Sequence, residues 1–525
     1  MNELTLPSID YTALAPILIL MGAAVIGVLV EAFVPRVYRH VTQLVLALGS
    51  VLLALLMVIR NANLRIIDGS EERVITAGWT IAVDGPTLFL QGAILVLAAM
   101  ALLLIGERSV ERGGAFVAQA AVTAESPEDR RQAEGRAGAT EVYPLTTFAI
   151  GGMLIFVAAN DLLTMFIALE VFSLPLYLLC ALARRRRLLS QEAAMKYFLL
   201  GAYASAFFLF GVALVYGFTA GIPGRGAGVD FATIHAAVSE SPASDVLLFA
   251  GMALIAIGLL FKAAAAPFHV WTPDVYQGAP TPVTGFMAAC TKVAAFGALL
   301  RVFHVAFADA AWDFTPVLGA VAVLTMLVGA VLAVTQTDIK RLLAYSSIAN
   351  AGYLLVGVLA PTRDGLSGTM FYLVAYGFSV LAAFAVVTLV RDADGEATHL
   401  SRWAGLGKRS PFYAGIFTFI LLAFAGIPLT SGFVSKFAVF APALDADQAW
   451  LVIAGVLTSM VLAFPYLRVV VMMWLSEPGD ATPTVTVPGG LTAAALTIGV
   501  AATLVLGVAP GPLLDLANGA AEFVR

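Results

Sequence analysis

Long apolar stretches recur along the whole chain and are separated by short polar segments. A helix needs about 20 mostly apolar residues to cross the hydrocarbon core of a membrane. Stretches near this length predict fourteen membrane-spanning helices: Ala13–Val34, Val41–Ile59, Thr87–Ile105, Leu145–Ala159, Leu162–Ala183, Gln191–Ala220, Asp245–Ala266, Pro282–Phe307, Phe314–Val334, Arg341–Leu359, Ser367–Val390, Pro411–Phe440, Trp450–Leu475 and Leu491–Val508. Only Asn160 and Asp161 divide the fourth stretch from the fifth.

Two of these stretches carry helix breakers close to a lysine. Pro267 and Pro273 follow Lys262 at the end of the seventh, and Pro428 precedes Lys436 in the twelfth. Proline cannot continue a helix, and irregular backbone survives at membrane depth only where protein or a cavity satisfies it. The two stretches are five helices apart, so they cross in opposite directions. The pattern predicts an all-α polytopic membrane protein with two inverted five-helix repeats and broken seventh and twelfth helices.

This division gives a single membrane domain over residues 1–525. Its expected parts are an N-terminal group of three helices at 1–105, a cytoplasmic insert at 106–143, a first five-helix repeat at 144–307, a second at 314–475 and a C-terminal helix at 491–508. The insert is rich in Ala, Gly, Glu and Arg, which is typical of a mobile or partly helical surface segment. Short β-like runs within residues 60–84 predict a small hairpin.

Basic loop residues predict the orientation in the membrane. Lys and Arg gather in the loops of one side, which is typical of the cytoplasmic face, and the run Arg184–Arg187 and Lys340 belong to that side. The opposite loops hold fewer basic residues, and Arg301 is counted among them. We therefore expect both termini on the outer face of a bacterial inner membrane.

Composition excludes several classes of protein. Hydrophobic residues make up 60% of the 525 residues and charged residues 12%, against roughly 25% charged in a soluble domain. A soluble enzyme and a disordered scaffold do not fit, and a net charge of −5 leaves no basic surface for nucleic acid. The lipid bilayer is the expected partner. No nucleotide-binding motif or cysteine cluster occurs among the residues, so we expect no cofactor in this chain.

After the basic loop residues are set aside, five basic residues remain inside the predicted spans, and one acid, Glu170, lies in the middle of the fifth: the basic residues are Lys196, Lys262, Lys292, Lys436 and Arg468. All of these except Arg468 belong to the candidate site, together with His269. Each charge at the centre of a membrane costs about 2.5–3.5 kcal/mol on the insertion scale. Lysine suits a proton relay, because burial disfavours its charged form while a nearby carboxylate favours it. We interpret the group as a proton route through the bundle, and His269, next to the first break, could pass protons between the repeats.

Each residue also has a plainer interpretation. Lys196 is close enough to the cytoplasmic end of its helix to extend to the surface. Arg468 could hold two helices together, His269 could be an ordinary loop histidine, and Glu170 with Lys262 could form a static ion pair. Lys292 is too deep in its helix to reach the surface easily.

Two long motifs resemble a known family. The segments His269-Val270-Trp271-Thr272-Pro273-Asp274-Val275-Tyr276-Gln277-Gly278-Ala279-Pro280-Thr281-Pro282-Val283 and Asp338-Ile339-Lys340-Arg341-Leu342-Leu343-Ala344-Tyr345-Ser346-Ser347-Ile348-Ala349 are similar to the antiporter-like subunits of respiratory complex I. The forms VYQGAPTPVT and SGFVSKF resemble subunit N of NADH-quinone oxidoreductase in particular. The similarity covers nearly the whole chain.

The resemblance implies roles for particular residues. Glu170 would be the fifth-helix acid partnered with Lys262, Lys292 the connecting lysine and Lys436 the terminal lysine facing the outer half-channel. Lys196 matches a sixth-helix lysine. The family also implies a complex with other membrane-arm subunits, neighbouring antiporter-like subunits among them. That complex carries FMN and iron–sulfur clusters and uses NADH and a quinone. The Ala-, Gly-, Val- and Arg-rich composition is typical of a GC-rich bacterium, which makes menaquinone a candidate for that quinone. No role carries over to the insert at 106–143.

Two other functions remain open at this point. The chain could instead serve a cation/proton antiporter or a membrane-bound hydrogenase, which would use the same buried charges with other partners. It could also be a membrane scaffold in which the charges fix helix register. Flavin and iron–sulfur clusters in the native assembly would favour complex I over the antiporter or hydrogenase. Activity that survives a charge-neutral double replacement of Glu170 and Lys262 would favour the scaffold.

Overall fold

The computed structural model describes residues 9–67, 74–111, 113–117, 122–123, 126–134, 138–222, 227–240, 246–392, 395–477 and 484–524. The first helices are α1 (Tyr11–Phe33), α2 (Arg36–Ile67), α3 (Gly85–Gly106), α4 (Pro127–Glu134), α5 (Val142–Ala158), α6 (Leu162–Cys180) and α7 (Arg187–Ala220). The middle of the chain forms α8 (Phe231–Glu240), α9 (Val246–Ala263), α10 (Trp271–Gly278), α11 (Thr281–Phe286), the π-helix η1 (Met287–Thr291), α12 (Lys292–Arg301), the π-helix η2 (Val302–Ala306) and the 3₁₀-helix η3 (Ala308–Ala310).

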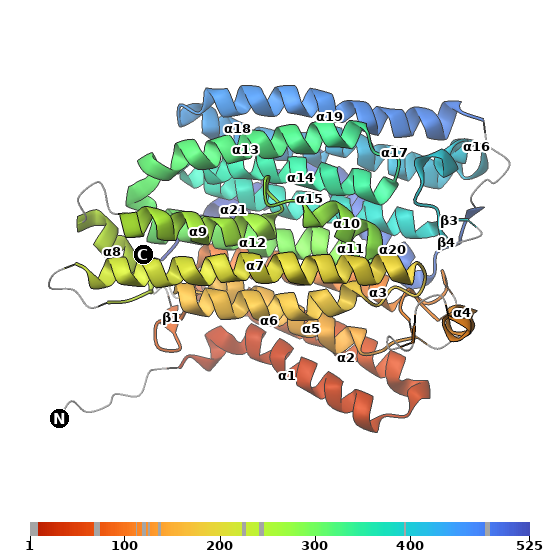
Figure 1. The fold of residues 1–525 in the computed structure, drawn as a ribbon, viewed down its shortest axis with the longest axis horizontal. Helices are drawn as coiled ribbons and strands as arrows, with labels where there is room; N and C mark the ends of the chain where they lie inside the picture. Colours follow the sequence, from red (N-terminus) through yellow and green to blue (C-terminus); the bar gives the residue numbers. More distant parts are fainter. Residues whose placement is uncertain are drawn as a thin grey trace.

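The remaining helices continue the bundle. They are α13 (Ala311–Val334), α14 (Ile339–Val358), α15 (Arg363–Leu389), the 3₁₀-helix η4 (Leu400–Trp403), α16 (Leu406–Arg409), α17 (Pro411–Ala425), α18 (Ser431–Asp445), α19 (Ala449–Leu475), α20 (Gly490–Val508) and α21 (Gly511–Ala520). The long helices lie side by side along the long axis of the molecule (Figure 1). Eleven helices among the described residues are long and apolar enough to cross a membrane. The helical membrane fold is therefore confirmed.

Polar capping residues set where several helices begin. The side chains of Asp10, Asp84, Asp161, Asp338 and Thr362 accept hydrogen bonds from backbone N–H groups in the first turns of α1, α3, α6, α14 and α15. Such caps satisfy donors that a helix start leaves without an internal partner. Asp161 also confirms the predicted division of the fourth and fifth stretches, because α5 ends at Ala158 and α6 begins at Leu162.

Both predicted breaks are present. The backbone leaves the helix after α9 and resumes at α10, and it leaves again between α17 and α18. At the second break Gly426 has φ +85°, a left-handed conformation that glycine adopts without steric cost. The eighth predicted span is not uniformly α-helical, because the wider turns η1 and η2 flank α12.

Short strands occupy the two ends of the bundle. The predicted hairpin is confirmed: β1 (Val74–Thr76) pairs antiparallel with β2 (Ile81–Val83). At the opposite end β3 (Val390–Asp392) lies between β4 (Gly395–Glu396) and β5 (Thr484–Val485). Figure 1 shows α8 and β1 at one end and α4, α16, β3 and β4 at the other.

The two ends of the described chain meet at the end of the bundle that carries the hairpin. The Asp10 amide donates to Thr76 Oγ1 at 2.8 Å, and the Val524 amide donates to Asp84 Oδ2 at 3.1 Å. The arginine run predicted as a cytoplasmic anchor lies at the opposite end. Within it, Arg184 and Arg187 are 2% and 4% exposed. They are therefore built into the protein rather than left as a free surface patch.

The insert at 106–143 is partly helical, as predicted, since it contains α4. Its described part is also held by direct contacts. Arg184 donates to the carbonyls of Gly113 and Gly114, and Arg187 forms an ion pair with Asp129 of α4 at 3.2 Å. The insert therefore covers the arginine run.

Candidate functional site

Lys262 is held in a cage of aromatic rings. It lies at the end of α9, is 4% exposed, and its Nζ donates to the Tyr197 hydroxyl at 3.1 Å. The same Nζ lies 4.8 Å, 5.0 Å and 5.4 Å from the ring centroids of Tyr197, Phe172 and Tyr177. Ring faces attract a cation most strongly where water is excluded. The cage can therefore hold the ammonium group without a directly bonded carboxylate.

The break after α9 builds this cage. Trp271, the first residue of α10, stacks on Tyr197 with ring centroids 4.5 Å apart and an interplanar angle of 12°. Its indole N–H donates to the carbonyl of Phe261, one residue before the lysine, at 3.0 Å. The interrupted backbone thus places Trp271 behind the ring that bonds Lys262.

Glu170 lies near this cage without closing an ion pair. It is on α6, and one of its carboxylate oxygens is buried without a hydrogen-bond partner. Within the described part of the chain, no ion pair of 4.0 Å or less joins Glu170 to Lys262, although the two interact electrostatically. The sequence predicted a partnered acid, and the structure gives a nearby acid that acts through space. A static ion pair at these two residues is not what the structure contains.

Lys292 is bonded to backbone. It is the first residue of α12, directly after the π-helical turn η1, and it is 4% exposed. Its Nζ donates to the Ser347 carbonyl of α14 at 2.7 Å and lies 5.7 Å from the Tyr376 ring centroid on α15. The buried side chains of Ser347 and Tyr376 also end in neutral hydroxyl groups. Lys292 therefore has neutral polar groups around it.

Lys436 caps the C-terminal end of α17, the helix that precedes its own. From α18 its Nζ donates to the carbonyls of Phe424 and Ala425 at 3.2 Å and 3.0 Å, and to Ser459 Oγ of α19 at 2.7 Å. The two carbonyls belong to the last turn of α17, where the helix dipole favours positive charge. The second break thus creates the site, because it leaves these carbonyls free to bind the lysine.

A small cavity with mixed polar and apolar lining adjoins Lys436. Its volume is about 10 Å³, close to the space that one water molecule needs, and its lining includes Asn350, Tyr372, Tyr376, Ser435 and Lys436. Tyr376 is also the residue whose ring lies near Lys292. Tyr376 therefore lies next to both the cavity beside Lys436 and the amine of Lys292.

Lys196 and His269 are placed differently from the three central lysines. Lys196 is 41% exposed and forms ion pairs with Asp274 and Glu192, both at 2.6 Å. Asp274 in turn pairs with Arg341 at 2.6 Å, so a charged network lies beside the first break. His269 is in the break itself and is partly buried. Within the described residues, no hydrogen bond or ion pair links it to the central lysines.

Two basic residues, Arg301 and Lys340, differ from their sequence interpretation. Arg301 was placed with the loop residues, but it ends α12 and is 0% exposed. Lys340 was also placed in a loop, but it lies in the first turn of α14, is 2% exposed and donates to the Ala279 carbonyl at 2.7 Å. Because Arg301 and Lys340 lie at helix ends, the sequence pattern did not reveal that their side chains are buried. Arg468 bonds the carbonyls of Val334 and Gln336, which fits the interpretation that it holds two helices together.

Sequence reasoning missed the partner of Arg301. Its guanidinium donates to Asp84 Oδ1 at 2.7 Å and to Thr87 Oγ1 at 2.6 Å, and it lies 4.8 Å from the Phe523 ring centroid. Asp84 is 1% exposed. The signal available in the sequence was an acid at the start of a very apolar stretch, but nothing there pointed to an arginine more than two hundred residues away.

Comparison with known proteins adds to this geometry. A family model described as "NADH:quinone oxidoreductase/Mrp antiporter, TM" matches residues 159–462. A protein of Salinispora arenicola named "NADH-quinone oxidoreductase subunit N" is 84% identical over 525 residues, which cover 100% of both chains. Among solved structures, a chain of respiratory complex I from Thermus thermophilus is 31% identical with a TM-score of 0.74, and the match covers 96% of this chain and 99% of that one. A chain of the Mrp complex from Dietzia sp. has a TM-score of 0.80 at 24% identity, covering 97% of each chain, and shows the shared fold.

Proposed function

Because the chain belongs to the NADH-quinone oxidoreductase subunit N family, we propose that its buried lysines form the relay by which it moves protons. The chain is an antiporter-like, proton-translocating membrane subunit of complex I, and its partners are other membrane-arm subunits. Quinone reduction takes place elsewhere in that complex. The question that this structure addresses is which groups carry the protons.

One observation carries the proposal. Lys262, Lys292 and Lys436 are each at most 7% exposed, and their closest hydrogen-bond partners are hydroxyls or carbonyls rather than carboxylates. A buried ion pair that serves stability alone needs directly bonded charges, because desolvation otherwise exceeds the Coulomb gain. Neutral partners leave each lysine able to lose its proton without leaving an opposite charge unpaired.

In this relay Glu170 controls the first lysine. When the carboxylate approaches Lys262 or gains charge, it favours the protonated amine, and when it withdraws, burial favours release. Lys262 then passes its proton towards Lys292. Tyr376 and the small cavity bridge Lys292 to Lys436, which releases the proton towards the outer half-channel.

We assign supporting roles to the two remaining candidates. Lys196, paired with Asp274, would set the charge beside the first break, and His269 would pass protons between the two repeats. The repeats at 144–307 and 314–475 each contain one break and one of the lysines Lys262 and Lys436. This arrangement supports, as a proposal, two inverted five-helix units.

The orientation follows from the basic residues. The arginine run and the insert would face the cytoplasm, and the end of the bundle with the hairpin and both termini would face outward. FMN and iron–sulfur clusters would reside in other subunits. An iron–sulfur cluster needs several thiolates, and the two cysteines of this chain, Cys180 and Cys290, are buried on separate helices. The acceptor in the assembled complex would be a quinone, with menaquinone as the candidate.

Proton pumping by the assembled complex tests the relay. Lys262→Ala should abolish most NADH-driven acidification of inverted membrane vesicles at equal complex content. Lys408→Ala, on the exposed face of α16, is the matched control and should leave pumping unchanged. Normal pumping by an assembled Lys262→Ala complex would overturn the proposal. Purification of the native assembly, with flavin and iron–sulfur absorbance as the readout, separately checks the partner complex.

A further inference from the structure

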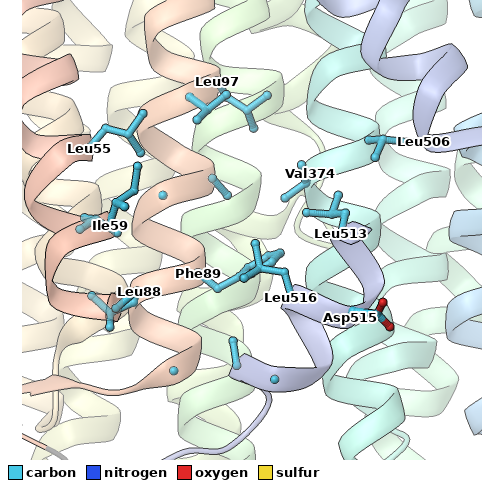
Figure 2. Close-up of a pocket in the computed structure, with 18 of the residues that line it drawn as sticks. Leu55, Ile59, Leu88, Phe89, Leu97, Val374, Leu506, Leu513, Asp515 and Leu516 are labelled. Atoms are coloured by element: carbon cyan, nitrogen blue, oxygen red, sulfur yellow. The ribbon is translucent and has the colours of Figure 1, made fainter. Parts of the chain in front are cut away.

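A large apolar cavity lies away from the lysines, between α2, α3, α15, α20 and α21. Its volume is about 1050 Å³, at the upper end of what small-molecule sites show. Figure 2 shows Leu55, Ile59, Leu88 and Phe89 on one side and Leu513 and Leu516 of α21 on the other. None of the proposed relay residues lines it. This cavity is therefore separate from the proton route.

The depth of the cavity matches one leaflet of a membrane. Along α3 the lining runs from Gly85 to Leu97. Twelve helical steps of 1.5 Å make this about 18 Å. One leaflet contributes half of a hydrocarbon core that is about 30 Å thick. The cavity begins at the end of the bundle that carries both termini, so it spans the leaflet on that side.

Polar groups gather at only one end of the cavity. The lining is apolar along the membrane-spanning helices, and its acids, Asp84, Asp515 and Glu522, lie where α3 begins and around α21. The described lining contains no Lys, Arg or His. Asp84 is already bonded to Arg301, whereas Asp515 is exposed. An occupant that matches this lining is amphiphilic, with a long apolar body and a positively charged group at one end.

A guanidinium lies close to the same end. Arg363, at the start of α15, donates from Nε to the carbonyl of Asn518, three residues beyond Asp515 on α21. Residues three apart on a helix are neighbours on its surface. Arg363 does not line the cavity, but it lies beside the helix that carries Asp515, so the two residues are placed to meet the phosphate and the amine of one zwitterionic headgroup.

We propose that this cavity binds a phospholipid with an amine headgroup, of the phosphatidylethanolamine type. Its acyl chains lie between α3 and α21, its ammonium contacts Asp515 and its phosphate contacts Arg363. An unfilled apolar void of this size would forfeit dispersion contacts along both walls, and acyl chains restore them. The lipid would thereby join the C-terminal helix α21 to α2 and α3. This proposal does not depend on which residues carry protons.

Photolabelling of the intact complex tests the proposal. The complex is reconstituted in phosphatidylcholine vesicles that contain a trace of phosphatidylethanolamine with a photoreactive acyl chain, and separately with the matching phosphatidylglycerol. Labelling of residues 85–97 is measured by peptide mapping, relative to labelling of the lipid-facing residues of α13. The ethanolamine lipid should label residues 85–97 about fivefold more, the factor that one exposed charge contact supplies.

Two variants sharpen the test. Gly92→Phe directs a ring into the cavity, since a Cβ there would meet only Val58 Cγ1 at 3.8 Å, and it should remove the labelling. Gly49→Phe, on an exposed face of α2 where a Cβ meets nothing within 4 Å, should leave labelling unchanged. Asp515→Lys should reverse the preference in favour of phosphatidylglycerol.

Three results would overturn the proposal. If both lipids label residues 85–97 equally, and Asp515→Lys does not change this, the cavity does not select an amine headgroup. Labelling of residues 85–97 that persists in an assembled Gly92→Phe complex would place the lipid outside the cavity. Absence of labelling at residues 85–97 by either lipid, while the lipid-facing residues of α13 are labelled, would mean that a neighbouring subunit and not lipid fills the cavity.

Discussion

Arg301 and Lys262 are both buried cations, but the protein treats them in opposite ways. Arg301 bonds a carboxylate, a hydroxyl and the Val157 carbonyl. The Nζ of Lys262 instead contacts one hydroxyl and three aromatic rings, and the Glu170 carboxylate interacts with it only through space. Guanidinium is always charged in proteins and bonds through a rigid fork, whereas an amine can give up its proton. The difference separates a cation that holds the structure from one that can change its charge.

The comparison also bears on the scaffold hypothesis. If buried charges served only to fix helices, Lys262 would be expected to resemble Arg301, with an acid in direct contact. The chain does build such a pair, at the start of α3, so the fold is able to supply one. The lysine site lacks it. The variants below test this difference between Arg301 and Lys262, and they run from the largest expected effect to the smallest.

Arg301→Ala should give the largest effect, and it should act on stability. The change leaves Asp84 buried without its partner, which typically costs about 3–5 kcal/mol. We expect the assembled complex to be nearly absent from membranes, as measured by immunoblotting of native gels. The exposed Arg409→Ala should assemble normally. The double change Asp84→Asn with Arg301→Met should recover much of the assembly, and failure of Arg301→Ala to reduce it would mean that the ion pair is not structural.

Lys262→Arg should stop pumping while preserving assembly. Arginine keeps the positive charge and the contact with the aromatic rings, but it cannot release its proton. We expect a loss of about a hundredfold or more in NADH-driven proton transport, the factor typical of a lost proton-transfer group. It is measured as fluorescence quenching in vesicles with equal amounts of complex. Lys408→Arg is the control. Full pumping with arginine would show that Lys262 acts only through its charge.

Glu170→Gln should have an intermediate effect. Glutamine has nearly the same size but no charge, so Lys262 loses the group that favours its protonated form. Pumping should fall severalfold, about the factor that 1 kcal/mol supplies. Glu128→Gln on the surface of α4 should change nothing. If Glu170→Gln pumps normally, the acid is not the control element, although Lys262 could still carry protons.

The smallest effects should separate the two broken helices. Tyr197→Phe removes the one hydrogen bond of Lys262 but keeps the ring, whereas Ser459→Ala leaves Lys436 bonded to two carbonyls. Loss of a hydrogen bond matters most where no other partner remains for the charged group. We expect pumping to fall clearly in Tyr197→Phe and by less than about twofold in Ser459→Ala. The reverse order would contradict the view that the carbonyls of α17 hold Lys436.

The sequence predicted the membrane fold and both breaks because their signals are local. Apolar length defines a span, and Pro428 or Pro267 interrupts one within a few residues. It also predicted which residues are ionisable inside the bundle, and the structure buries Lys262, Lys292 and Lys436. What each amine contacts could not be predicted, because Ser347 and Tyr197 lie on other helices and their positions depend on packing.

The errors have the same physical origin. Arg301 and Lys340 stand at the ends of helices, where a basic residue usually extends to water. Their burial depends on Asp84 and on the Ala279 carbonyl, which approach only when distant segments fold together. Likewise, α21 begins at Gly511, directly after Pro510, and was not expected as a helix, yet it forms one wall of the lipid cavity.

The π-helical turn before Lys292 has an evolutionary consequence. Such turns hold one more residue per hydrogen-bonded loop than an α-helix, so η1 is equivalent to an α-helical segment with one residue inserted. Removing one residue between Met287 and Thr291 would restore regular winding and rotate the preceding segment about 100° relative to the lysine. The direction of the Lys292 side chain towards α14 therefore depends on the number of residues in this helix. A related helix without the extra residue would direct the same amine elsewhere.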